Sequence, residues 1–480
     1  MAGQSLAPDS LSSMRSLTIN GNMAFERGSK ALEQDRSLGR VMAKRRFAIA
    51  WLFGLILVSL LGSFPGGSRA AEHVVRRPGL VDLDPETRAI TPAQARLEAE
   101  FADGRYREAT AAAEQVLASV RARYGEQSLR AVPPLVNLAT VLQRAGNAAA
   151  AVEAYGRAVR LVESTQNLRD LRLARPLYGM GLALHEAGRP HQAATVLAQA
   201  VFISRMNLGL WSLDQLEFYD ALMESLIALG RYDDVAARQQ ARLVIVERAT
   251  GAGSAEVLEA LADAGGWLRR AGRYREERDV HQRRLALLRE RPGASDASLV
   301  PVLRDVAQTY TAALEPDAGG VLALSQALAI EERQPAPSAA ARAEILTELG
   351  DYYYLFRALR PADLYYERAR KLLVEAEDRE TLEALFGQPK ALYVPQPSLA
   401  EAAPHDVSVA EALVRMTVDA RGQPRDVEIL ELGPSGDDAA RAQVLLSVGR
   451  ARFRPRITAN GAAATEAVCY RFRFRYPGKV

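Results

Sequence analysis

Apolar residues recur at helical spacing through the middle of the chain, and breaks in this pattern return at a fixed interval. Residues 132–145 carry apolar side chains three or four positions apart, and residues 148–162 resume that spacing after the pair Gly146-Asn147. Glycine supplies the backbone freedom that a tight turn between two helices needs. The pattern therefore predicts an antiparallel helical hairpin over residues 132–162.

The glycine at this break belongs to a ladder with a period of 42 residues. The five ladder glycines are Gly104, Gly146, Gly188, Gly230 and Gly272. A fixed period of this size is typical of stacked repeats, so we predict a mostly α chain with an α-solenoid over residues 93–385. The pattern weakens after residue 290, but residues 345–376 still predict a hairpin, which gives about seven hairpins in all.

These repeats resemble the tetratricopeptide family, in which small residues recur around such a turn. The matching residues are Ala139, Gly146 and Ala158 in one unit and Gly181, Gly188 and Ala200 in the next. The usual period of that family is about 34 residues, and the longer period here resembles the repeats of kinesin light chain. HEAT-type repeats, of about 40–47 residues, are the alternative.

The tetratricopeptide resemblance implies a groove that binds proteins or peptides and is lined by the first helix of each hairpin. The candidate lining residues are Asn137, Gln143, Arg144, Met180, His185 and Glu186. An ordinary solvated helix face is the other interpretation of these side chains. The partners are unidentified proteins or peptides, with outer-membrane or other envelope proteins among the candidates.

The apolar period changes from helical to alternating in residues 386–480. Residues 412–419 and 425–432 alternate on either side of a glycine-bearing turn, which predicts a β-hairpin. Residues 439–447 carry a helical apolar stripe, and residues 465–476 alternate aromatic with basic side chains. We predict a small α+β domain made of a β-hairpin, a helix and a strand.

This domain resembles the carboxy-terminal domain of TonB, the periplasmic energy transducer. The matching residues are Val418, Asp419, Gly422, Asp426, Val427, Phe453 and Pro455. The resemblance implies strand addition to a short segment of an outer-membrane receptor. The chain departs from that family because a helical array replaces a long proline-rich spacer. We therefore predict a partner-binding module, with an inner-membrane-anchored component of energy transduction to outer-membrane transporters as the alternative.

The amino-terminal region predicts export. Residues 1–41 are polar and predict disorder or a misassigned translation start, and residues 42–70 have the basic start, apolar run and small-residue end of a signal peptide. Cleavage is predicted between Ala70 and Ala71, followed by a linker over 71–92. An uncleaved anchor is the alternative, although the apolar run 47–62 is shorter than the ~20 residues that span a bilayer. The predicted location is the Gram-negative periplasm, either free or anchored in the inner membrane and facing the periplasm.

Composition removes several classes of function from consideration. A formal net charge of +3 over 480 residues does not predict a nucleic-acid partner. The one cysteine, Cys469, permits no intrachain disulfide, and the five histidines form no pair at zinc-site spacing. No phosphate loop, dinucleotide fingerprint or nucleophile motif is present, so the sequence predicts neither an enzyme nor a cofactor.

Overall fold

The structure is a computed structural model of the chain, and it describes residues 78–165, 167–291, 295–395, 407–433 and 438–477. The predicted start region 1–41, the signal 42–70 and its cleavage site at Ala70 and Ala71 lie outside the described residues. All the described residues belong to one compact unit, Pro65–Val480. Within this described part, no helix has the length and apolar character needed to cross a membrane.

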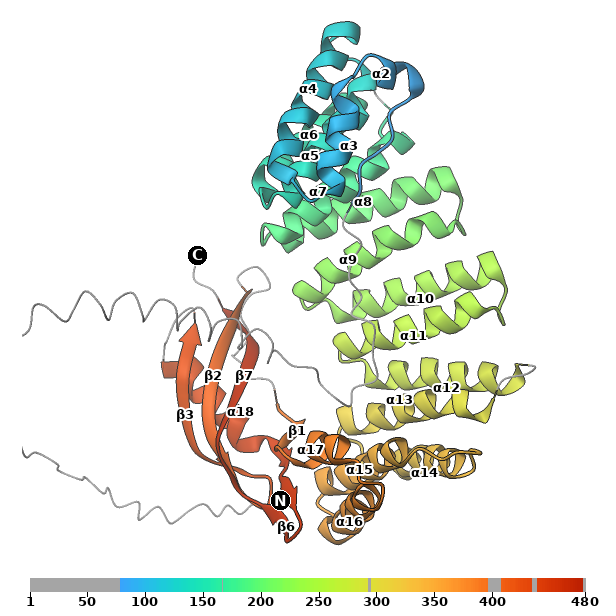
Figure 1. Cartoon of the computed structure of the whole chain (residues 1–480). Coiled ribbons are helices and arrows are strands. Elements are labelled where there is room, and N and C mark those ends of the chain that lie inside the picture. Colours follow the sequence, from blue (N-terminus) through green and yellow to red (C-terminus); the bar gives the residue numbers. More distant parts are fainter. Residues whose placement is uncertain (1–77, 166, 292–294, 396–406, 434–437, 478–480) are drawn as a thin grey trace, which may run out of the picture. The chain divides into compact units, whose positions relative to one another are not determined.

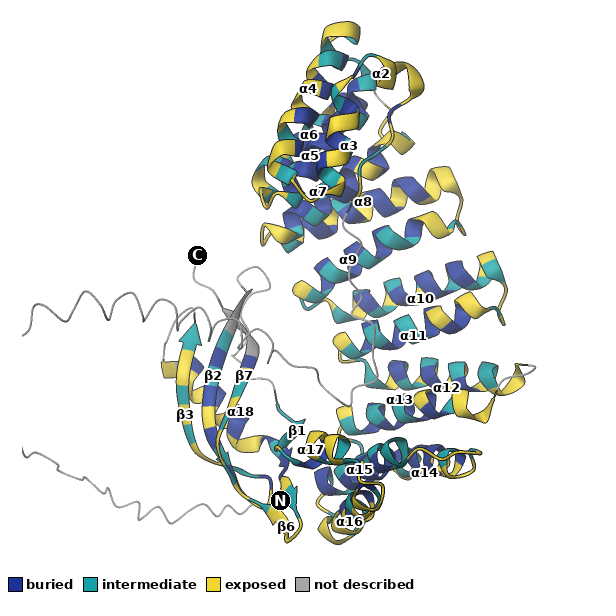
Figure 2. Cartoon of the chain, in the orientation of Figure 1, coloured by how far each residue is buried: buried dark blue, intermediate teal, exposed yellow. Residues whose placement is uncertain are grey.

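Helices pair into seven antiparallel hairpins between residues 93 and 375 of the described chain (Figure 1). The pairs are α3 (Ala93–Ala102) with α4 (Tyr106–Tyr124), α5 (Val132–Arg144) with α6 (Ala148–Glu163), α7 (Ala174–Glu186) with α8 (Pro190–Leu208), α9 (Leu216–Ala228) with α10 (Tyr232–Thr250), α11 (Ala255–Arg270) with α12 (Tyr274–Glu290), α13 (Leu299–Ala312) with α14 (Ala318–Glu332), and α15 (Ala339–Leu355) with α16 (Leu359–Glu375). Their facing sides are buried and their outward sides exposed, as amphipathic patterning requires (Figure 2).

The ladder glycines form the turn inside each of the first five hairpins. Gly146 has a φ of +83°, and its N–H donates to the Gln143 carbonyl at 3.0 Å. The next N–H, of Asn147, donates to the Leu142 carbonyl at 2.9 Å. This is a Schellman motif, which pairs carbonyls at the end of the first helix before the second begins. All five ladder glycines have φ between +68° and +83°.

The same turn continues after the glycines are lost. Leu314 stands 42 residues after Gly272 and has a φ of +54°, and Arg357 has a φ of +64°. Both turns keep the Schellman bonds, since Glu315 N–H donates to the Tyr310 carbonyl and Ala358 N–H to the Tyr353 carbonyl. The weakening of the sequence pattern after residue 290 is therefore a loss of glycine and not of hairpin geometry.

We expect Leu314→Gly to raise the free energy of unfolding by about 1 kcal/mol, because glycine removes the left-handed strain of a side chain at positive φ. Urea unfolding of the full chain measures the change. Leu322→Gly, at an exposed position within α14, is the matched control and should lower stability by about 1 kcal/mol. A Leu314→Gly variant less stable than the parent would contradict the assignment of strain.

A second ladder, which the sequence analysis did not identify, ends the second helix of three hairpins. Gly125, Gly209 and Gly251 have φ of 91°, 92° and 93°, and Asn167 occupies the missing step of the same period. Three residues after each step stand Ser128, Asp170, Ser212 and Ser254, whose side chains accept a hydrogen bond from the backbone at the next helix start. The first three of these starts are the short 3₁₀ helices η1 (Leu129–Ala131), η2 (Leu171–Leu173) and η3 (Leu213–Gln215), and η4 (Asp296–Ser298) precedes α13.

The segment before the first hairpin is packed and is not an open linker. Helix α2 (Pro85–Ala89) begins after Asp84, whose carboxylate accepts from the Thr87 N–H at 3.0 Å. Leu83 is buried in the same apolar cluster as the first hairpins. Residues 80–91 of the predicted linker 71–92 thus contain a short helix and apolar side chains that pack against the first hairpins.

The apolar core of the array is divided near α12. One cluster extends from Leu83 to Ala271, another begins at Leu285, and only a small group of buried apolar residues around Leu261 lies between them. Helix α12 buries the polar residues Glu277 and His281 together with Leu285. The Arg269 side chain donates to Glu277 at 2.7 Å, which adds a buried polar contact between α11 and α12.

The C-terminal module contains a three-stranded antiparallel sheet in the order β3-β2-β7. Its strands are β2 (Val407–Val418), β3 (Pro424–Gly433) and β7 (Thr465–Pro477), and helix α18 (Asp438–Arg450) packs Val444 and Val448 into its core. These elements agree with the predicted hairpin, helix and strand. The structure adds three features that the sequence pattern does not predict. They are α17 (Arg379–Phe386) and two short pairings, of β1 (Lys390–Tyr393) with β4 (Arg452–Arg454) and of β5 (Arg456–Thr458) with β6 (Gly461–Ala463).

Candidate functional site

First helices of neighbouring hairpins contact one another at three steps of the array, and we call the side of the array that carries the first helices the first-helix face. Helix α5 contacts α7, α7 contacts α9, and α13 contacts α15. Of the predicted groove residues, Asn137, Gln143 and Arg144 lie on α5, and Met180, His185 and Glu186 lie on α7. The structure gives these six residues different roles.

Asn137 binds the backbone of another segment. Its side chain is fully buried, Nδ2 donates to the Val81 carbonyl at 2.9 Å, and Oδ1 accepts from the Val81 N–H at 2.6 Å. A carboxamide has one donor group and one acceptor group side by side, so it can satisfy both polar groups of one peptide residue. The chain's own residues 78–84 thus lie against the first-helix face as a bound peptide would.

Gln143 and Arg144 hold the hairpins together. The Tyr155 hydroxyl lies 2.9 Å from the Thr140 hydroxyl and donates to Gln143 Oε1 at 3.4 Å, and burial raises the pKa of Tyr155. Arg144 Nη2 donates to the Tyr106 hydroxyl at 2.7 Å, with the guanidinium over the Tyr106 ring. Gln143 therefore packs the two helices of the second hairpin against each other, and Arg144 connects that hairpin to the first.

On α7, Met180 and His185 are half-buried and Glu186 is exposed. His185 Nδ1 lies 3.3 Å from the Ser225 hydroxyl of α9. Burial lowers the pKa of His185, against nearby carboxylates of Glu224 and Glu186 that raise it. This shift favours the neutral imidazole, whose ring nitrogen can share a hydrogen bond with the Ser225 hydroxyl.

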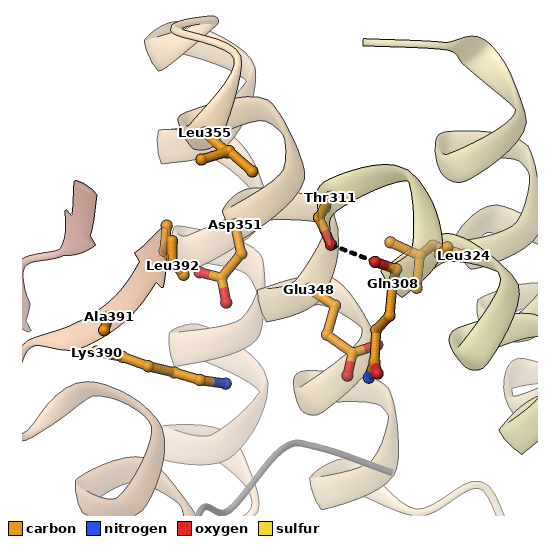
Figure 3. Close-up of a pocket in the computed structure, with 10 residues that line it drawn as sticks. Gln308, Thr311, Leu324, Glu348, Asp351, Leu355, Lys390, Ala391 and Leu392 are labelled. Carbon is orange, nitrogen blue, oxygen red and sulfur yellow. Dashed lines mark hydrogen bonds between the residues drawn. The ribbon is translucent and has the colours of Figure 1, made fainter. Parts of the chain in front are cut away.

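A cavity of about 210 Å³ opens near the far end of the first-helix face, between α13, α15 and α17. A second cavity of about 150 Å³ adjoins it and is bordered by β1 of the C-terminal module (Figure 3). Both are lined by Glu348, Asp351 and Lys390. In Figure 3 the Lys390 side chain extends from β1 below Asp351.

Opposite charges meet in these cavities. Arg304 donates to Glu348 at 2.7 Å and to Glu344 at 3.0 Å. Burial raises the pKa of Glu348, although its hydrogen bond with Arg304 and the charge of Lys390 act to lower it. Such groups can bind polar atoms of a partner through charge-assisted hydrogen bonds. In the described residues, no cluster of three or more His, Cys, Asp or Glu side chains is arranged to hold a metal ion.

Four residues of the predicted C-terminal motif meet at one turn. Val418 ends β2 in the core, and the Asp419 carboxylate accepts from the N–H groups of Arg421 and Gln423 at 2.9 and 2.8 Å. The Gly422 carbonyl then accepts from the Phe453 N–H at 3.0 Å, which ties the turn to β4.

The other three motif residues lie apart from this turn. Asp426 has a φ of +49° at an irregularity in the pairing of β3 with β2. Val427 packs at the edge of the core, and Pro455 is buried between β4 and β5. Their positions are structural, since they shape the strand and the link between two strands.

Arg454 joins the C-terminal module to the array, and the sequence analysis did not single it out. Its side chain is 1% exposed, and Nη1 lies 2.9 Å from each carboxylate oxygen of Asp351 in α15. Its Nη2 donates to the Leu385 carbonyl at 2.7 Å, and its guanidinium lies 5.5 Å from the centre of the Phe386 ring. The Tyr366 hydroxyl donates to Asp351 at 2.8 Å, which completes a buried polar network.

Part of the repeat array matches a known protein family. The family profile described as Tetratricopeptide repeat matches residues 130–205, which extend from just before α5 into α8. No curated protein matched the chain.

Solved structures of helical repeat proteins are similar to this chain at low identity. A putative kinesin light chain from Podosopora anserina, with nearly identical TPR-like repeats, is 16% identical, with 42% of this chain and 97% of that chain covered and a TM-score of 0.38. BtubC (BKLC) from P. vanneervenii is 17% identical, with 61% and 95% covered and a TM-score of 0.33. A tetratricopeptide repeat protein from Parabacteroides merdae is 14% identical, with 62% and 99% covered and a TM-score of 0.33.

Proposed function

We propose that this chain is an exported periplasmic scaffold that binds partner proteins or peptides. Its two binding surfaces are the first-helix face of the repeats and the C-terminal module. It acts without catalysis and without a cofactor. Stacked repeats of this kind present an extended surface to partners.

The pairing of Asn137 with Val81 carries this proposal. The amide recognises only backbone atoms, so any peptide that reaches the same place can satisfy it in the same way. Residues 78–84 are tethered to the array, which gives them a high effective concentration in competition with a free peptide. A partner therefore binds this part of the face after the segment has been displaced.

Random heptapeptides displayed on phage and selected on a chain that lacks residues 78–84 test this function. We expect selected peptides to be displaced by a synthetic peptide of residues 78–84. Asn137→Leu should weaken their binding about tenfold or more, because two hydrogen bonds to buried polar groups are lost. Fluorescence anisotropy gives the affinities.

Gln199→Leu is the matched control, because it makes a similar amide-to-leucine change at an exposed position of α8. Its affinity for the selected peptides should equal that of the parent. Selected peptides that bind the Asn137→Leu variant as tightly as the parent would exclude this part of the face as the peptide site.

The alternative is a membrane-anchored component of TonB-type energy transduction. The order of β2, β3, α18 and β7 supports it, since β3 and β7 are the outer strands of the sheet and strand addition needs an outer strand. This alternative requires that residues 47–62 are retained. Intact mass of the mature chain and membrane retention after a high-salt wash distinguish it from the scaffold, together with receptor-dependent uptake in a strain lacking residues 387–480.

A further inference from the structure

Large apolar side chains are exposed together at one end of the hairpin α7/α8. Six of them are between 43% and 62% exposed, and we refer to them as the apolar tip: Leu168, Phe202, Met206, Leu210, Trp211 and Leu213. They come from the loop before η2, the last turns of α8 and the loop that leads into η3. Soluble proteins expose single apolar side chains routinely, but a contiguous group marks a surface that contacts something else.

Printed contacts hold these pieces in one surface. Asn207 Nδ2 donates to the Arg169 carbonyl at 2.9 Å, which places the loop around Leu168 beside the end of α8. Gln215 Nε2 donates to the Leu210 carbonyl at 3.0 Å, which fixes the loop that carries Trp211. The Arg248 guanidinium lies 5.9 Å from the centre of the Trp211 ring. The apolar tip is therefore a fixed part of the fold.

The period of the array provides an internal comparison for the tip. At a distance of 42 residues, the position of Met206 is occupied by Ser164 in the preceding repeat and by Arg248 in the next. The position of Trp211 is occupied by Arg169 and Gly253. The same hairpin end thus folds with polar or small residues elsewhere in the chain. Folding therefore does not require these apolar side chains, and their exposure indicates that they contact another molecule.

The charged residues around the apolar tip indicate what kind of surface it contacts. Arg169, Arg205 and Arg248 are exposed around the apolar tip. Of the carboxylates in the two loops of the tip, Asp170 is held by Arg172 at 2.6 Å, and that of Asp214 lies 3.4 Å from the Ser212 hydroxyl. Tryptophan, leucine and phenylalanine within a rim of arginine are the residues that enter the headgroup region of anionic membranes. We propose that the apolar tip inserts into the surface of an anionic lipid bilayer.

Vesicle binding by the full chain tests this proposal. The chain has three tryptophans, of which Trp267 is fully buried, so a Trp51→Phe background leaves Trp211 as the exposed reporter. On vesicles of phosphatidylcholine with about a quarter phosphatidylglycerol, we expect a blue shift of Trp211 emission and quenching by brominated lipid. Binding should weaken as salt increases and should be much weaker on phosphatidylcholine alone.

Variants locate the contact. Phe202→Ser combined with Trp211→Ser should reduce partition onto the anionic vesicles about tenfold or more. Arg169→Gln combined with Arg205→Gln should reduce it about 25-fold, since each basic side chain near an anionic surface contributes about 1 kcal/mol, or about fivefold in affinity. Leu322→Ser combined with Leu364→Ser removes two exposed leucines elsewhere, which are 59% and 69% exposed, and should leave partition unchanged. Circular dichroism confirms that each variant keeps its helical content.

Two results would overturn the proposal. The first is unchanged vesicle binding by the Phe202→Ser, Trp211→Ser variant together with an unshifted Trp211 in the parent, which would assign the contact to another part of the chain, such as residues 47–62. The second is a blue shift of Trp211 that grows with protein concentration in the absence of vesicles, which would show that the apolar tip pairs two copies of the chain.

Discussion

Replacing Asp351 with alanine is expected to lower the free energy of unfolding by about 3–5 kcal/mol and to release the C-terminal module from the array. The variant leaves the Arg454 guanidinium buried without its carboxylate partner, and removing one member of a buried ion pair has a cost of this size. The Tyr366 hydroxyl loses its acceptor in the same step. Urea unfolding and hydrogen exchange at β1 and β4 measure the two effects.

The exposed pair between Arg415 and Glu428 in the C-terminal module is the matched control. Both side chains are at least half exposed, so Arg415→Ala should change stability by less than about 1 kcal/mol. Asp351→Leu combined with Arg454→Met should recover much of the loss, because an apolar pair of similar volume can replace a buried ion pair. An Asp351→Ala variant as stable as the Arg415→Ala control would contradict the role of the buried pair.

Gly422→Ala is expected to lower the free energy of unfolding by about 3 kcal/mol or more, because two costs combine at this position. The residue has a φ of +62°, which strains any side chain. A Cβ there would also lie 1.8 Å from the Phe453 carbonyl oxygen, so β4 must move and the Phe453 N–H must leave the Gly422 carbonyl. Urea unfolding measures the total loss of stability, and hydrogen exchange of the Phe453 amide reports the local opening.

Gly461→Ala separates the two costs. Gly461 has a φ of +99°, but nothing lies within 4 Å of the place where a Cβ would stand. It should therefore show the strain alone, about 1–2 kcal/mol. Equal losses from both substitutions would mean that the close approach of Phe453 contributes nothing.

The repeat array was readable from the sequence because glycine reports backbone conformation directly. Gly146 and Gly272 have a positive φ, a backbone conformation that favours glycine over other residues. The turns are therefore visible in the sequence as glycines at a fixed spacing. Leu314 and Arg357 adopt the same conformation at an energetic cost, and such positions leave no mark in the sequence. The second ladder at Gly125, Gly209 and Gly251 carried the same signal and could have been found by its period.

The candidate sites were less readable because they depend on contacts between distant segments. Asp351 and Arg454 are 103 positions apart in the sequence. Each is a charged residue, and taken alone it predicts an exposed surface position. Asn137 was a candidate for the groove, but its partner Val81 lay in a stretch predicted to be a linker. Phe202 and Met206 are apolar residues within a helix, so the sequence alone does not distinguish them from core residues.

The buried Glu277 and His281 of α12 have a consequence for how the array unfolds. In a linear stack, cooperativity passes from one repeat to the next through their shared interface, and the weakest interface sets where it stops. The apolar clusters that end at Ala271 and begin at Leu285 are linked here by buried polar groups and by the small cluster around Leu261, so we expect the two parts of the array to unfold as separate foldons. Trp267 belongs to the first cluster and reports the melting of the upstream half. Thermal unfolding followed by Trp267 emission and by total helical content should then give different midpoints.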